Sequence, residues 1–192
     1  MLINIKMRIK ILIILIMTAT TLYSQKKLNA DPKNTKLEWL GEKVLGKHPG
    51  TIMLQSGWLI WENNRITSGE FIIDMRTIKS DEGLTRLEEH LRSDDFFSVE
   101  KFPVSKLTIT GSDDFGKGTA TVRGTLTIKG ITNPVEFTAT RQEKEDGTWF
   151  YANITIDRTQ YNVRYGSGKF FDNLGDKIIY DNFKVNVTLF VK

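Results

Sequence analysis

The chain has 192 residues, of which 40% are hydrophobic and 26% are charged. This composition is ordinary for a globular protein and argues against an intrinsically disordered chain. The charge is nearly balanced, with 27 basic and 23 acidic residues, so it gives no case for a nucleic-acid partner. Cysteine is absent, which excludes disulfides, thiolate nucleophiles, cysteine metal sites and a lipid anchor attached to cysteine.

The N-terminal segment, residues 1–24, differs from the rest of the chain. Three basic residues between positions 6 and 10 precede the apolar run Ile11–Met17, and small and polar residues follow that run. This order is typical of a secretory signal peptide, which we expect to be removed just before Gln25. A membrane anchor is the alternative, but the run is about half of the roughly 20 residues that span a bilayer.

Export changes the charge balance of the working protein. The segment 1–24 carries three basic and no acidic residues, so the mature chain keeps 24 basic against 23 acidic residues. We therefore expect a periplasmic or secreted protein with a net charge of +1 and no stable membrane anchor.

After a short polar lead-in at residues 25–34, residues 35–192 are predicted to form one domain. Apolar and polar residues alternate there with the period of two that is typical of β-strands. Turn-forming pairs such as Asn63-Asn64 and Asp146-Gly147 separate the strands and indicate antiparallel hairpins. The clearest strands are expected at residues 52–61, 66–75, 104–110, 119–129, 135–140, 149–157 and 183–191.

Only residues 81–92 show a helical pattern. Ser80 is the expected N-cap, and the side chains of Leu84, Leu87 and Leu91 form one apolar stripe, while Glu88 and Glu89 are expected to face water. One amphipathic helix with about eight strands predicts an all-β fold, an antiparallel β-barrel with the helix packed over a wall or an opening.

Candidate catalytic groups are few and scattered. His48 falls in a turn-like stretch and His90 on the predicted helix, and neither has a partner at the spacing of metal ligands. The segment Gly166–Lys169 lacks the spacing of a phosphate-binding loop, and the aspartates near strand ends form no distinguished pair. We therefore predict no enzyme, and neither catalytic residues, nor a metal site, nor a cofactor.

Aromatic residues gather in the irregular stretches of the chain. Phe96, Phe97, Phe102 and Phe170-Phe171 all lie outside the alternating segments. Such residues line a pocket at a barrel mouth, or they plug a solid core. A barrel of about eight strands can be filled by side chains or hold one small ligand, so the pattern alone leaves both interpretations open.

Five short motifs, in order along the chain, resemble the pattern of the YceI-like family. Their order and spacing hold from about Leu37 to Lys192. The motifs are Gly57 with Gly69–Asp74, His90–Val99, Phe102-Pro103, Gly124–Gly130 and Ile156–Arg158.

The resemblance implies an extended, lipocalin-like barrel with a long apolar tunnel for a polyisoprenoid chain, such as a quinone tail. Head-group selectivity would come from the mouth, where Asp157 and Arg158 are the candidates, although a structural ion pair between strands is the alternative. The lipid-binding residues predicted on the inner face and at the mouth are Phe71, Ile73, Phe96, Phe97, Phe102, Val122, Leu126, Ile128, Phe137, Ile154, Ile156 and Tyr161.

Two functions follow as hypotheses. The first is an exported carrier or sequestering protein that binds an isoprenoid or another long-chain lipid, either as a monomer or as a homodimer. The second is a solid-cored barrel that acts as a stress or protein-interaction module without a ligand. A hollow interior would favour the first hypothesis, and a filled one would favour the second.

Removal of the signal peptide is directly testable. Intact-mass measurement of the protein from its native compartment should give a chain that starts near Gln25, because the cleavage signals end there. A full-length mass for the exported protein would contradict this prediction.

Overall fold

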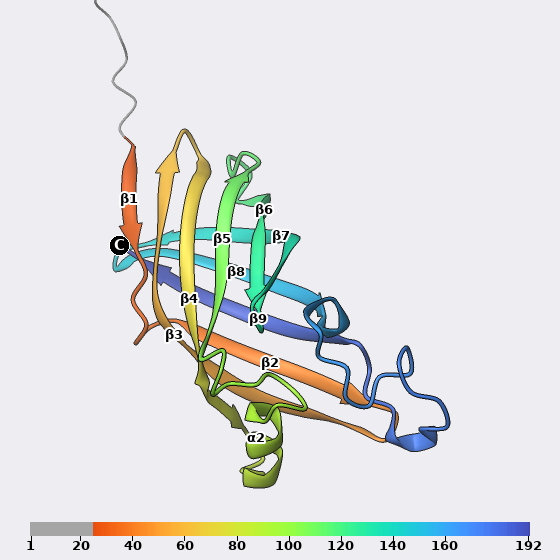
Figure 1. Cartoon of the computed structure of the whole chain (residues 1–192). Coiled ribbons are helices and arrows are strands. Elements are labelled where there is room, and N and C mark those ends of the chain that lie inside the picture. The colour runs from red at the N-terminus through yellow and green to blue at the C-terminus, as the bar shows by residue number, and fades with distance from the viewer. Residues whose placement is uncertain (1–24) are drawn as a thin grey trace, which may run out of the picture.

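The computed structural model describes residues 25–192, and the predicted signal peptide lies outside this range. Within this range the chain forms nine strands, one α-helix and two short 3₁₀ helices (Figure 1). The helices are α2 (Thr85–Arg92), η1 (Arg158–Tyr161) and η2 (Gly175–Lys177). The strands are β1 (Lys26–Asn29), β2 (Lys36–Lys43), β3 (Gly46–Glu62), β4 (Arg65–Ser80), β5 (Val104–Ser112), β6 (Thr119–Ile128), β7 (Ile131–Lys144), β8 (Gly147–Asp157) and β9 (Asn182–Val191).

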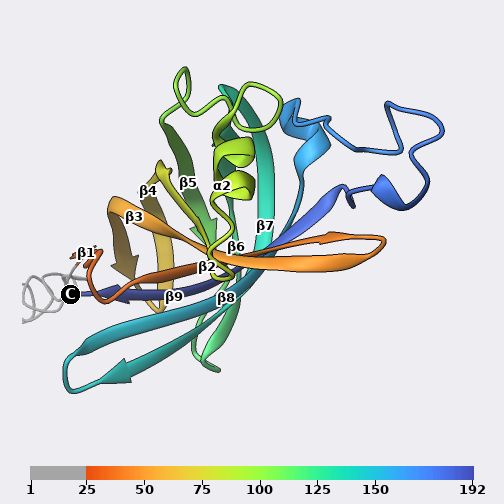
Figure 2. The ribbon, with the colours of Figure 1, turned by 90° about the horizontal axis from the view of Figure 1, so that it is seen from below.

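Strands β2 to β9 form a closed antiparallel barrel. Their order around the ring is β3-β2-β9-β8-β7-β6-β5-β4, and the pairing of β3 with β4 closes it. Figure 2 looks at the barrel from the side on which α2 lies. The predicted fold, an antiparallel barrel of about eight strands with one helix, is confirmed.

The strand β1 lies outside this ring of eight. It pairs with Trp58–Trp61 of β3, while β2 pairs with the earlier part of the same strand. Backbone hydrogen bonds of 2.8 and 3.0 Å then join Asn29 to Lys192. The expected lead-in at residues 25–34 thus contributes a strand, and Leu28 is its buried apolar residue.

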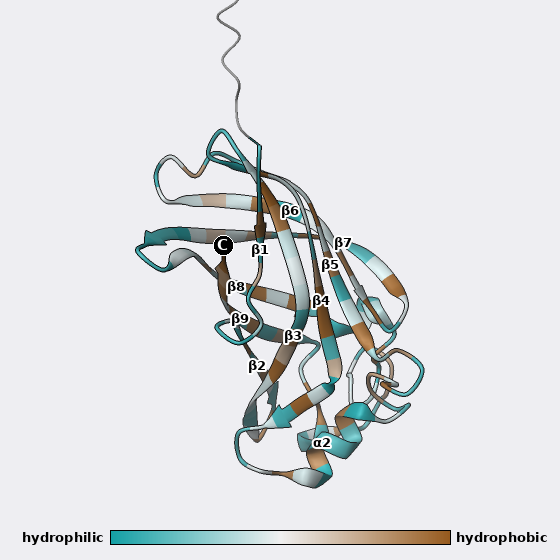
Figure 3. Ribbon diagram, turned by 90° about the vertical axis from the view of Figure 1, so that its left-hand side faces the viewer, coloured by the Kyte–Doolittle hydropathy of each residue, from teal (hydrophilic) through white to brown (hydrophobic). Residues whose placement is uncertain are grey.

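Alternation of residue types gives the barrel its two faces. Hydrophobic and hydrophilic positions alternate along most strands in Figure 3. On β6, every second residue from Ala120 to Ile128 is buried, as predicted. Gly124 belongs to this inner row, and a Cβ atom there would lie 2.2 Å from the carbonyl oxygen of Thr108. Glycine at this position therefore permits the close approach of β5 and β6.

The helix is shorter than predicted. Strand β4 continues to Ser80, so the residues that follow form a turn in which Gly83 has a φ of 67°. The expected Ser80 cap is therefore wrong, and α2 begins at Thr85 without a side-chain cap. The expectation that Glu88 faces water is also wrong, because its carboxylate accepts the backbone N–H of Ser80 at 2.9 Å. Leu91 is buried against the barrel.

None of the helices within residues 25–192 is long and apolar enough to cross a membrane.

Candidate functional site

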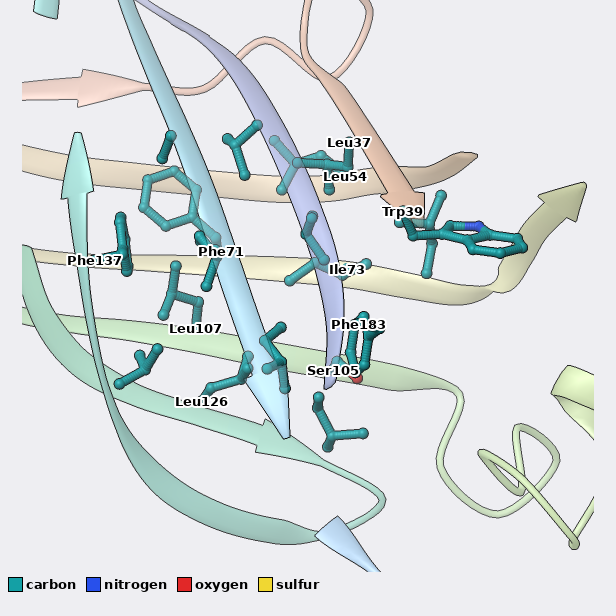
Figure 4. A pocket seen from close by; sticks show the side chains of 18 of the residues that line it. Leu37, Trp39, Leu54, Phe71, Ile73, Ser105, Leu107, Leu126, Phe137 and Phe183 are labelled. Atoms are coloured by element: carbon teal, nitrogen blue, oxygen red, sulfur yellow. The ribbon is translucent and has the colours of Figure 1, made fainter. Parts of the chain in front are cut away.

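The interior of the barrel contains a cavity of about 230 Å³. Each of the eight barrel strands contributes lining side chains, and so does Leu91 of α2. Figure 4 shows Phe71, Leu107 and Phe137 directed into this space from three different strands. Almost all of the lining surface is apolar, although four residues with polar side chains, Thr35, Ser105, Arg158 and Tyr180, also border the cavity.

The cavity settles whether the barrel is hollow or solid. Leu107, Phe137, Val185 and Val187 line it, and they are only partly buried although they face inward. Inward side chains keep exposed surface only where the core leaves free space. The volume lies below the ~300–1,000 Å³ that is usual for small-molecule pockets.

One end of the barrel is closed by an aromatic plug formed by Trp61, Phe115 and Phe150. The ring of Trp61 lies 5.6 Å from Phe115 and 6.0 Å from Phe150, and the latter two rings are 5.6 Å apart. The guanidinium of Arg141 stacks over Trp61 at 4.5 Å. This plug blocks the end at which β3 turns into β4.

The opposite end is covered by α2 and by residues 93–103, which we call the covering loop. Phe96 and Phe97 from this loop line the cavity, with ring centroids 5.1 Å apart. The ammonium of Lys129 holds the loop in place by donating to the carbonyl oxygens of Asp94 at 3.1 Å and Phe96 at 2.8 Å. Burial lowers the pKa of Lys129.

Arg158 fastens a second loop, residues 162–181, at the same end. Its side chain is 2% exposed. The guanidinium donates to the carbonyl oxygens of Val163 at 2.8 Å, Ile179 at 2.9 Å and Tyr180 at 3.1 Å. Asp181 lies 3.7 Å away, and burial lowers the pKa of Arg158. The arginine touches the cavity, but its donors are largely used to hold backbone, which favours the structural alternative over a head-group contact.

Asp157 lies outside the cavity, in a shallow polar depression on the barrel surface. Burial acts to raise the pKa of its carboxyl, but hydrogen bonds from Thr159 and Lys169 outweigh burial and leave the pKa below its ordinary value. The ammonium of Lys169 approaches Asp157 to 2.9 Å. Asp157 thus ties the 162–181 loop to the end of β8, and it does not reach a ligand inside the barrel.

Most of the predicted lipid-binding residues lie together around the cavity. Phe102 does not: it packs outside, where a Cβ atom on Gly130 would lie 2.8 Å from its ring. Tyr161 does not line the cavity either, but it is buried against lining residues such as Ile154 and Ile156. That these residues bind lipid stays a prediction. Those that line the cavity are Phe71, Ile73, Phe96, Phe97, Val122, Leu126, Ile128, Phe137, Ile154 and Ile156.

Other lining residues were not among those predicted. Leu37, Trp39 and Gly41 on β2 line the cavity, and the polar residues Lys36 and Glu38 on either side of Leu37 were a signal in the sequence, although Leu40 interrupts the alternation. Trp39 also donates its indole N–H to the carbonyl oxygen of Thr51 at 3.1 Å. Ile179 sits in an irregular loop, where no periodicity marks the inner side.

One histidine differs from its expected place, whereas the other, His90, lies on the helix as predicted. His48 lies in strand β3, not in a turn, and its Nδ1 is 2.7 Å from the carboxylate of Glu82. His90 is half-buried, and its ring lies 4.4 Å from that of Tyr165. Across residues 25–192, acidic and histidine side chains form no group of three or more that could hold a metal ion.

Comparison with protein families gives a match over nearly all of the described chain. The model of the YceI-like domain matches residues 28–191. The chain belongs to the YceI-like family. A UPF0312 protein of Pseudomonas putida is 27% identical over 121 residues, which cover 60% of this chain and 63% of the relative. A UPF0312 protein of Shewanella denitrificans is 30% identical over 101 residues, 52% of this chain and 53% of the relative. The matched regions span less than two thirds of these relatives.

Solved structures show that this YceI-like chain shares its fold with distant proteins. BcnA of Burkholderia cenocepacia has a TM-score of 0.65 at 19% identity, covering 85% of this chain and 99% of that one. A polyisoprenoid binding domain from Saccharophagus degradans has a TM-score of 0.67 at 16% identity, covering 86% and 97%. Identities this low show the fold alone.

A bulky residue on the inner wall tests the cavity. Val185→Trp should lower the free energy of unfolding by less than about 1 kcal/mol, because the indole enters free space, whereas overpacking a filled core costs ~1–3 kcal/mol. The same change should weaken uptake of a short-chain ubiquinone, used as an apolar probe, more than tenfold, since losing burial of two methylenes is worth about 1.6 kcal/mol. Denaturant midpoints and probe titration measure both effects.

The control for this change is Lys184→Trp on the outer face of the same strand, which should leave stability and probe uptake nearly unchanged. A strongly destabilised Val185→Trp protein would show that the space is too small to matter.

A substitution that preserves the charge of Arg158 tests whether this residue holds backbone or binds a lipid head group. Arg158→Lys should lower the free energy of unfolding by about 3 kcal/mol, because an ammonium cannot reach three diverging carbonyl oxygens and leaves buried acceptors unpaired. Arg164→Lys, on the exposed side of the same loop, is the control and should change stability by less than ~0.5 kcal/mol. Unchanged stability with weakened ligand binding in Arg158→Lys would instead assign Arg158 to the head group.

Proposed function

We propose that the protein is an exported carrier or sequestering protein that binds an isoprenoid-type lipid inside its barrel. The observation that carries this proposal is the apolar cavity that runs between the strands of the closed barrel. A protein with the same fold is a polyisoprenoid binding domain, which supports the choice of ligand. The family is one of binding proteins, so we propose no catalysis.

The tail of the lipid would supply the affinity. Each buried methylene contributes about 0.8 kcal/mol, and the entropic cost of binding offsets part of this gain. Because the cavity volume of about 230 Å³ lies below the ~300–1,000 Å³ that is usual for small-molecule pockets, we propose that a long tail widens the cavity or extends beyond it.

The distribution of polar residues around the cavity favours one orientation of the ligand. Three of the four, Ser105, Arg158 and Tyr180, lie toward the end that α2 and the two loops cover. The hydroxyl of the fourth, Thr35, already accepts the backbone N–H of Phe190 at 3.3 Å. The hydroxyl of Ser105 faces the weak acceptor Sδ of Met75 at 3.0 Å. At the other end stands the aromatic plug. We propose that the tail points to the plug, with the polar head near Tyr180, whose side chain is half-exposed.

We also propose that the protein is exported. Its support is the signal-like pattern of residues 1–24, and its physical reason is that a polyisoprenoid is insoluble. An aqueous compartment outside the cytoplasm needs a carrier that keeps such a tail away from water.

Tryptophan fluorescence tests the proposed ligand. Saturable quenching by a short-chain ubiquinone is expected, and Trp39 should report most of it because its ring lines the cavity. Trp39→Phe should therefore lose most of the quenching. Trp58→Phe is the matched control: Trp58 lies outside under the ammonium of Lys27 at 4.9 Å, so this variant should keep the signal.

If wild-type protein shows neither quenching nor a lipid in the organic extract of material from its native source, the proposed function is wrong.

A further inference from the structure

The wall of the barrel is not hydrogen-bonded all the way around. Strands β7 and β8 pair only from Ala139–Lys144 to Gly147–Ala152, next to their shared hairpin. Below this ladder, residues 131–138 pair with β6 alone and residues 153–157 pair with β9 alone. The two strands diverge from the hairpin in Figure 2. We call the unpaired stretch the seam.

Side chains, not backbone hydrogen bonds, close the seam. Val135 and Phe137 of β7 pack in the same apolar cluster as Ile154 and Ile156 of β8. All four residues also line the cavity. Below them, the side-chain amide of Asn133 donates to the carbonyl oxygen of Gln160 in η1 at 3.0 Å. The seam is therefore an apolar strip along the cavity. At its lower end η1 packs against β7, with the buried Tyr161 in the same cluster and the hydrogen bond of Asn133 beside it.

An unpaired stretch within a barrel wall is unusual, because closing a barrel normally leaves no strand edge without a partner. Unpaired strand edges expose backbone N–H and C=O groups, and proteins normally pair or cover them. Some other ladders of this barrel are as short, such as β2 with β9 and β4 with β5, but there at least one of the two strands ends within a few residues of the last pair. Only between β7 and β8 do both strands continue for five or more residues beyond the last pair, and this stretch borders the cavity.

The two ends of the barrel offer more resistance than the seam. At one end stands the aromatic plug of Trp61, Phe115 and Phe150. At the other end, beside Tyr180, the 162–181 loop is fastened by the three hydrogen bonds of Arg158 and by the backbone bridge of Lys43 with Ile179. Opening the seam breaks no backbone ladder.

We propose that the seam between β7 and β8 is the place where the lipid crosses the wall, and that its widening enlarges the cavity for a long tail. This inference rests on the proposed function. It explains how a cavity of about 230 Å³ accepts a chain longer than the space it offers. An apolar tail that passes between Phe137 and Ile154 exchanges one apolar contact for another.

The absence of cysteine from the chain allows the seam to be locked selectively. In the variant Asn133→Cys with Gln160→Cys, a short thiol-to-thiol cross-linker joins the lower end of the seam, while the ladder at Ala139 and Ala152 holds the upper end. Exchange of a short-chain ubiquinone, followed by stopped-flow quenching of Trp39, should slow at least tenfold on cross-linking. The cross-linked protein should still bind the ubiquinone at equilibrium, because the cross-link slows exchange and does not fill the cavity. Intact mass confirms the link.

The matched control is Thr127→Cys with Thr132→Cys. These residues face each other across the complete β6–β7 ladder, with hydroxyl oxygens 2.8 Å apart, and linking them should leave the exchange rate unchanged. Asn133→Ala tests the opposite direction. It removes the hydrogen bond from Asn133 to the carbonyl oxygen of Gln160 and should speed exchange several-fold, without loss of fold by circular dichroism.

The outcomes separate this inference from the proposed function. If the wild-type protein binds the quinone and the locked seam exchanges it at the unlocked rate, the seam inference is overturned, and the end beside Tyr180 is the route. If the wild-type protein binds no lipid at all, the proposed function fails and the seam inference fails with it.

Discussion

Closure of the hydrogen-bonded ring is the constraint on which the rest of this structure depends. Because β3 pairs with β4 and β2 pairs with β9, every strand presents one face to the same interior, and the number of strands sets the width of that interior. Whether the interior is filled then depends on residue size. Gly41, Ala139 and Ala152 are among the inward residues, and their small side chains leave the space that larger ones would fill.

One partly buried and one buried cation organise irregular segments of the chain at the covered end of the barrel. Lys129 and Arg158 come from the ends of the barrel wall, and each donates to backbone carbonyl oxygens of an irregular segment. Irregular backbone leaves carbonyl groups without ladder partners, and such groups need donors where they are buried. These two residues stand in the motifs Gly124–Gly130 and Ile156–Arg158, so those motifs have a physical role in holding the covered end of the barrel.

The strand pattern was predictable because it depends on local alternation. Residues 119–129 show one apolar face over a long run, and the structure places that face inside. Strand β1 was missed because it has four residues and one inward apolar side chain, Leu28. Serine is a common N-cap residue, so Ser80 was predicted to begin the helix. It is instead the last residue of β4, and residue type alone does not distinguish these two places.

Which residues line the cavity and which border the seam depends on contacts between strands that are distant in the sequence, and the sequence pattern does not reveal these contacts. Aromatic identity did not distinguish Phe96 and Phe97, which line the cavity, from Phe102, which packs outside. The volume of the cavity follows from residue sizes on eight different strands. The seam follows from pairing register, because the residues on both sides of it alternate as regularly as those of a paired ladder.

The pairing of the outermost strands imposes an order on folding. β9 is the last strand in the chain, yet it provides the partner for both β2 and β8, and Lys192 is bonded to Asn29 beside β1. The ring therefore cannot close on a partial chain: until β9 is available, two strand edges remain without partners. Contacts between such distant parts of a chain also slow folding. A chain that crosses a membrane from its N-terminus would remain an open sheet during transit, and it would become a barrel only on the far side.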